Sequence, residues 1–195
     1  MGLLDILLGR TKPVAPDLDR LFALPSAAVT LEAGAGFTPT GTGAVCFATV
    51  EGGAFTQAHR EVQALLDADT DRTGGPVELQ RDQYGYSWLV SRRAPDQLID
   101  LVNDLHAVNS AMEANGFGPQ LLCSVAGFRD EGGRRLTLVY LYKRGTFYPM
   151  CPLPGRQKRD NALELQLATL LKNDLRIEED LSRWFPVWGA PGTED

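Results

Sequence analysis

The segment "PQLLCSVAGFRDEGGRRLTLVYLYK" (residues 119–143) decides the fold class. Its two apolar runs, 119–128 and 134–143, flank a short stretch of turn residues, which is the pattern of a β-hairpin. A second pair of strand candidates, 77–83 and 86–93, is joined by a turn around Gly85. Because hairpins dominate, the sequence predicts a mainly antiparallel sheet.

Amphipathic helices are expected on one face of this sheet. The clearest helix, 96–115, carries apolar residues at spacings of three and four and ends at Gly116, a natural C-cap. A second helix is expected over 160–172 with Asp160 as its N-cap, and a third over 57–69. Helices packed on a hairpin sheet make an α+β fold.

The remaining segments complete a predicted order of strand, strand and helix that occurs three times. We expect strands at 28–33 and 44–51, separated by a glycine-rich turn. Short helices are expected at 15–25, where Pro25 would end the helix, and near 178–184, where Glu178, Glu179 and Asp180 would interact favourably with the helix dipole.

Length, charge and cysteine content limit the class of protein. A chain of 195 residues favours one domain, 1–195, and leaves open a subdivision into 1–94 and 95–195. The net charge of −6 argues against general nucleic-acid binding. Cys46, Cys123 and Cys151 form no C-x-x-C pair and fit reduced thiols in a cytosolic protein. We expect Cys46 and Cys123 to be buried and Cys151, between prolines, to be the most accessible.

No motif indicates catalysis. The glycine-rich stretch 34–43 lacks the spacing and the following helix of a nucleotide loop. Neither His59 nor His106 belongs to a metal-ligand spacing. A thiol-dependent enzyme would need a catalytic pair made by His106 with Cys123 or Cys151. This function is the less favoured alternative. We therefore predict a protein that is not an enzyme and has no catalytic residue, cofactor or metal.

The segment "LYKRGTFYPMCPLPGRQKR" (141–159) is basic and aromatic within an acidic chain. Its three prolines exclude a helix or a central strand, which leaves a loop that covers the core, a catalytic loop or a docking surface. We predict an ordered docking loop over 143–159, with its aromatic residues packed inward, its cations in solvent and the C-terminal aromatics beside it. The candidate partner-binding residues are Lys143, Arg144, Phe147, Tyr148, Arg156, Lys158, Arg159, Trp184, Phe185 and Trp188.

The N-terminal segment "MGLLDILLGRTKP" (1–13) has an apolar side but lacks the features of a secretion signal. We expect a short helix over its first residues that closes the core. The alternative is a weak foot on the membrane surface or on a partner.

Several long segments of the chain carry a resemblance to a known family: "MGLLDILLGRTKP", "LFALPSAAVTLEAGAGFTPTGTGAVCF", "EGGAF", "DLHAVNSAMEANGFGPQLLCSVAGF", "LVYLYKRGTFYPMCPLPG", "RDNALELQ" and "RWFPVWGAP". They resemble the PspA-associated protein family PspAB of bacteria and archaea. The resemblance implies association with the PspA (phage shock) membrane-stress system and a gene neighbourhood shared with the HtpX membrane metalloprotease. It implies no catalytic residues.

The order of elements in the second half is also similar to the YbjN and type III secretion chaperone fold. There a helix like 96–115, a strand pair like 119–143 and a helix like 160–172 pack as an α+β sandwich, often in a dimer. This similarity implies a chaperone-like fold and leaves a homodimer open.

These observations predict a non-enzymatic accessory or adaptor protein of the envelope-stress response. We expect it in the cytoplasm, at the inner face of the membrane, where it would dock on a PspA-type coiled coil, on HtpX-linked machinery or on lipid headgroups. The main alternative is a chaperone-like module that shields an amphipathic client segment.

Overall fold

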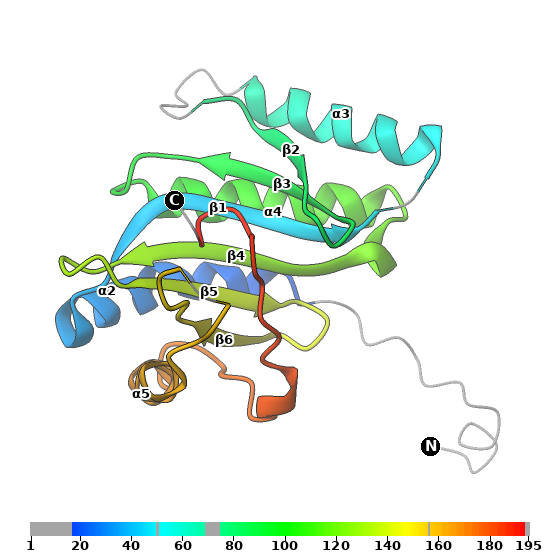
Figure 1. The fold of residues 1–195 in the computed structure, drawn as a ribbon. Coiled ribbons are helices and arrows are strands. Elements are labelled where there is room, and N and C mark those ends of the chain that lie inside the picture. Colours follow the sequence, from blue (N-terminus) through cyan, green and yellow to red (C-terminus); the bar gives the residue numbers. More distant parts are fainter. Residues whose placement is uncertain (1–16, 50, 69–74, 156, 194–195) are drawn as a thin grey trace, which may run out of the picture.

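Six antiparallel strands form one sheet in the order β2-β3-β1-β4-β5-β6 (Figure 1). The structure is a computed structural model that describes residues 17–49, 51–68, 75–155 and 157–193. The predicted N-terminal helix or membrane foot lies outside the described residues. The strands are β1 (Thr38–Ala48), β2 (Glu78–Arg81), β3 (Tyr86–Arg92), β4 (Leu121–Arg129), β5 (Arg135–Leu141) and β6 (Thr146–Met150).

The α-helices pack mainly against one face of the sheet, and α5 lies beside the β6 edge (Figure 1). The described α-helices are α2 (Leu24–Ala35), α3 (Gly53–Asp67), α4 (Leu98–Ala114) and α5 (Asn161–Leu171). The 3-10 helices are η1 (Asp19–Ala23), η2 (Gly118–Gln120) and η3 (Leu181–Arg183). The predicted α+β class is therefore confirmed.

The elements that decided the fold class form as predicted. The hairpin of residues 119–143 is the β4–β5 pair, in which Arg129 lies opposite Arg135. All six apolar residues of the predicted α4 stripe are buried: Leu98, Leu101, Val102, Leu105, Val108 and Met112. The side chain of Asp160 accepts a hydrogen bond from the backbone N–H of Leu163, as an N-cap should.

The predicted order of elements is wrong in the first half. Residues 28–33 belong to α2 and not to a strand. Leu24, Ala28 and Leu31 recur at helical spacing and are buried, and Pro25 occupies the first turn, where its missing N–H costs nothing. The predicted helix at 57–69 begins earlier, at Gly53, and the one near 178–184 is only the short η3.

The helix-free face of the sheet is covered by the C-terminal tail (Figure 1). Trp184 stacks on Tyr148 of β6 with 5.9 Å between ring centroids, and the Tyr148 hydroxyl donates to the backbone oxygen of Phe185. Cys46 and Cys123, which lie opposite one another on β1 and β4, belong to the same apolar cluster. Whether the chain divides at residue 94 stays a prediction, although β1 pairs with strands from either side of that point.

We predict that Phe147→Ala lowers the free energy of unfolding by about 3 kcal/mol, because Phe147 is 1% exposed and its ring lies 4.5 Å from that of Tyr140. Phe185→Ala is the matched control, since that ring is 59% exposed and its loss should change stability by less than about 1 kcal/mol. Chemical denaturation measures both variants, and equal losses would contradict the assignment of Phe147 to the core.

Candidate partner-binding site

The aromatic half of the predicted docking segment is strand β6, at one edge of the sheet. Phe147 and Tyr148 are both 1% exposed and point to opposite faces, Phe147 toward the helices and Tyr148 toward the C-terminal tail. The prediction that these aromatics pack inward is therefore confirmed. Pro149 is compatible with this strand because β6 is an edge strand, where a missing N–H breaks no ladder bond.

The outer edge of β6 is closed by residues from later in the chain. The backbone N–H of Phe147 donates to the Arg176 oxygen, and the N–H of Glu178 donates to the Phe147 oxygen, each over 2.8 Å. Phe147 thereby forms a parallel bridge with Ile177, and the next outward position is Pro149, which has no donor. Another strand therefore cannot add to this edge without displacing residues 176–178.

The loop that follows β6 is anchored by backbone hydrogen bonds. The N–H of Cys151 donates to Glu164 Oε1 of α5, and the N–H of Asp160 donates to the Cys151 oxygen, each over 2.8 Å. Inside the loop, the N–H of Leu153 donates to the Lys158 oxygen over 2.8 Å. The proline-rich segment is thus an ordered extension of the sheet edge.

Arg159 joins the loop, α5 and the C-terminal tail. Its Nε lies 2.8 Å from Glu164 Oε1, and its other guanidinium nitrogens donate to the backbone oxygens of Trp184 and Pro149. The Arg159 side chain is only 15% exposed, so the prediction that it points into solvent is wrong. The physical reason is Glu164, a carboxylate 3% exposed that requires a cation beside it.

Arg144 is also held by a buried carboxylate. Its Nη2 lies 3.0 Å from Glu178 Oε1, and the Thr146 hydroxyl donates to Glu178 Oε2 over 2.7 Å. The acidic cluster was predicted to interact with a helix dipole. Glu178 instead is 2% exposed and pairs with Arg144, so this prediction is wrong for Glu178. The hydrogen bond from Arg144, followed by that from Thr146, lowers the pKa of Glu178 to about 2.

The other candidate residues differ in exposure. Lys143 and Lys158 are exposed, and the Lys143 ammonium donates to the Pro119 oxygen over 2.8 Å. Leu153 is 39% and Phe185 59% exposed, while Trp184 is buried. We call Leu153, Lys158 and Phe185 the exposed rim. Arg156 lies outside the described residues.

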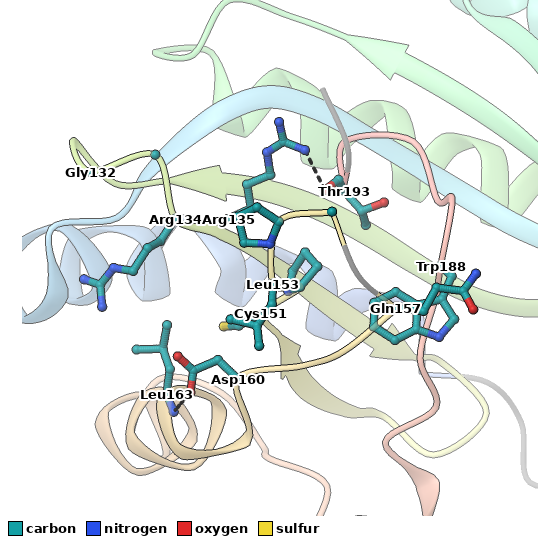
Figure 2. Close-up of a pocket in the computed structure, with 14 residues that line it drawn as sticks. Gly132, Arg134, Arg135, Cys151, Leu153, Gln157, Asp160, Leu163, Trp188 and Thr193 are labelled. Atoms are coloured by element: carbon teal, nitrogen blue, oxygen red, sulfur yellow. Dashed lines mark hydrogen bonds between the residues drawn. The ribbon is translucent and has the colours of Figure 1, made fainter.

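Beside this rim is a cleft of about 580 Å³. Figure 2 shows its walls: the β4–β5 turn with Arg134 and Arg135, the loop after β6 with Leu153, and the tail with Trp188 and Thr193. Arg135 donates to the Thr193 oxygen over 3.3 Å, which ties the tail to the hairpin. The cleft combines apolar walls with two arginines and the carboxylate of Asp160, and Arg134 is paired with Asp130 over 2.6 Å. It therefore suits a mainly apolar segment, with Arg135 as the cation nearest to an acidic group of that segment.

A family model described as PspA associated protein B matches residues 1–192. The chain belongs to this family, PspAB. No curated protein and no solved structure matches it. The predicted similarity of this PspAB chain to the fold of YbjN and the type III secretion chaperones stays a prediction.

The cysteines of this PspAB chain lie in the interior. Cys46 and Cys123 are buried as predicted, but Cys151 is 1% exposed, so the prediction that it is the most accessible thiol is wrong. Prolines keep the chain out of a helix, yet the hydrogen bonds to Glu164 and Asp160 draw Cys151 inward. Burial raises the pKa of the Cys151 thiol to about 12. The other half of the hypothetical catalytic pair, His106, lies 3.1 Å from Asp19.

The described residues lack both a metal-binding cluster and a helix suited to span a membrane. No group of three or more histidine, cysteine, aspartate or glutamate side chains is placed to hold a metal ion. Among the described helices, none combines the length and the apolar character that a membrane span requires.

The sequence interpretation missed the two buried carboxylates that organise this region. For Glu164 a signal was available, because it falls on the same helical face as Leu167, Ala168 and Leu171. A glutamate on the buried face of a helix indicates a paired charge. For Glu178 no comparable signal existed, since it lies in an irregular segment and its partners are more than thirty residues away in the chain.

The Glu178 pair should make stability depend on acid pH. Because the folded pKa, about 2, is lower than the ordinary value of 4.5, ionised Glu178 stabilises the fold fully above about pH 4.5. This contribution is lost as pH falls through about 2. We therefore expect Glu178→Gln to lower stability near pH 7 and to flatten the loss of unfolding free energy between pH 4.5 and 2, as measured by urea denaturation.

Glu179→Gln is the matched control, because Glu179 is exposed and next to Glu178 in the chain. Its profile should follow that of the wild type. A Glu178→Gln profile as steep as the wild-type profile would contradict the role given to this carboxylate.

Proposed function

We propose that this PspAB chain is a non-enzymatic accessory protein that binds a PspA-type helical partner at the cytoplasmic side of the membrane. The exposed rim and the adjoining cleft form the binding surface. The observation that carries this proposal is the anchoring of the rim: the loop between β6 and α5 is fixed by Arg159 and Glu164, yet it presents Leu153 and Lys158 outward.

A fixed loop is suited to binding because it loses little conformational entropy when a partner arrives. Leu153 of the loop and Phe185 of the C-terminal tail supply exposed apolar area. Lys158 supplies positive charge at the loop, on a protein whose net charge is −6. At the cleft wall Arg134 is already paired with Asp130 over 2.6 Å, so it adds little free charge. This local charge favours a partner with an acidic face, and its main effect would be on the association rate.

The family supports the choice of partner, because its description names association with PspA. A helical partner fits the site better than an added strand does, since residues 176–178 already occupy the edge of β6. An amphipathic helix would place its apolar residues against Leu153 and Phe185 and its acidic residues near Lys158.

The test is binding of the purified PspA-family protein from the same cell, measured by biolayer interferometry at low and high salt. We expect the double variant Arg156→Glu, Lys158→Glu to slow association about tenfold at low salt, with the difference fading as salt rises. Arg159 is left unchanged in this design, because its reversal would place a second carboxylate beside buried Glu164.

The matched control is the double reversal Arg60→Glu, Arg81→Glu, which changes net charge equally at residues of α3 and β2. It should leave association within about twofold of the wild type. Leu153→Ser should weaken binding at both salt concentrations, because it removes apolar contact and not charge. Unchanged binding by both rim variants at low salt would overturn the proposal.

A further inference from the structure

A second groove lies at the opposite end of the sheet, between α3 and strand β2. Its volume is about 460 Å³. Phe55, His59 and Gln63 line it from α3, and Leu79 and Arg81 line it from β2. None of these residues belongs to the rim or to the cleft described above, so the groove is a separate feature.

Strand β2 is the edge strand here, and its outward backbone groups can be identified. Val77, just before β2, donates its N–H to Asp67 Oδ1 over 2.8 Å and accepts from Gln63 Nε2 over 3.0 Å. Both partners are on α3, so the backbone groups of Val77 point away from β3. In an antiparallel strand the outward groups recur at every second residue, which assigns Leu79 and Arg81 to the same side.

The inner side of the strand agrees with this assignment. The N–H of Asp82 donates to the Tyr86 oxygen over 3.0 Å, which places Asp82 among the residues that bond toward β3. Glu78 and Gln80 share that parity and pair with Val90 and Trp88. In the described part of the chain, the outward N–H and C=O groups of Leu79 and Arg81 therefore have no hydrogen-bond partner.

The helix side of the groove has an apolar floor. His59 is 3% exposed, and its ring lies 4.3 Å from that of Phe55 and 4.9 Å from that of Phe47. Its Nε2 atom has no hydrogen-bond partner among the described residues. Burial, with a smaller effect of Arg81, lowers the pKa of His59, so the ring is neutral near pH 7. Leu79, 42% exposed, completes the floor.

The charge at the mouth of the groove is mixed, with an excess of cations. Arg60 and Arg81 line it, and Glu51 is the one carboxylate among the lining residues. Both arginines are exposed, and within the described ranges neither forms an ion pair. The groove therefore offers two cations and unpaired strand groups side by side.

We propose that this α3–β2 groove binds an extended, acidic segment of a partner protein by strand addition to β2. The backbone of the segment pairs with Leu79 and Arg81, its apolar side chains lie on Phe55 and His59, and a carboxylate interacts with Arg60 and Arg81. Main-chain pairing supplies affinity in this binding mode, and the pockets between helix and strand supply specificity. The proposal goes beyond the binding of a PspA-type helix, because it concerns another surface and another conformation of the ligand.

Synthetic peptides test the proposal on the full-length chain. The probe is a labelled peptide of about eight residues, within the ordinary range of strand lengths. One face of the extended peptide carries valine and glutamate in turn, and the other face carries threonine. We expect it to shift the amide NMR signals of Leu79 and Arg81 and to bind at least about tenfold more tightly than the same peptide with lysine in place of glutamate.

Backbone pairing is tested with two N-methylated versions of the acidic peptide, each blocked at one of the two alternating sets of amides. Only one set can face β2, so one version should lose about tenfold in affinity and the other should bind as the parent does. On the protein, Leu79→Pro removes an outward N–H and keeps the ladder with β3, so it should lower affinity about tenfold. Leu79→Ala retains the donor and should lower it less.

Several outcomes would overturn the proposal. They are absence of binding at millimolar peptide, equal affinity for both N-methylated peptides, or NMR shifts that map to the rim and not to Leu79 and Arg81. Sedimentation at rising concentration gives a further outcome: a dimer that Leu79→Pro dissociates would assign this edge to a second copy of the chain. The Arg156→Glu, Lys158→Glu variant should bind the peptide normally, which separates this test from that of the PspA-type partner.

Discussion

The ion pair between Arg159 and Glu164 holds together the three segments that meet at the β6 edge. Glu164 also accepts the N–H of Cys151, and Arg159 also donates to the Trp184 oxygen. A buried carboxylate without a cation would be costly, and breaking such a pair costs more than its formation gains. The positions of the proline-rich loop, of α5 and of the tail across the second face of the sheet therefore depend on one another.

This constraint gives the two ends of the sheet different properties. At β6 the edge is occupied by residues 176–178, by Pro149 and by the anchored loop, so the partner that we propose there would contact side chains on a fixed surface. At β2 the edge is short and its outward groups at Leu79 and Arg81 are free within the described chain. One end is thus suited to a folded, helical partner and the other to an extended segment. If both proposed surfaces bind as we propose, the chain links two partners, as an adaptor does.

Local patterns in the sequence predicted much of the fold. The β4–β5 hairpin, the α4 stripe and the Asp160 cap depend on residues close together in the chain, and each forms as expected. The prolines correctly excluded a central strand, since β6 is an edge strand. The strand predicted at 28–33 failed because β-branched Val29 and Thr30 suggested a strand, whereas the buried residues of this segment follow helical spacing.

The site was harder to predict because its decisive contacts are long-range. The residues of the basic cluster look alike in sequence, yet Arg159 is nearly buried while Lys158 is exposed. What separates them is the position of Glu164 and Trp184 in the folded chain. The outward groups of β2 were likewise invisible, because they depend on strand order and on the contacts of Gln63 and Asp67 with Val77.

Amide hydrogen exchange of the loop between β6 and α5 tests the central claim most directly, namely that this basic segment is a fixed part of the fold. The N–H groups of Cys151, Leu153 and Asp160 all donate to acceptors within the protein. We predict protection of these amides close to that of strand β5, and a loss of protection at Cys151 in a Glu164→Leu variant, which removes the acceptor. Exchange of all three as fast as in exposed loops would contradict the account.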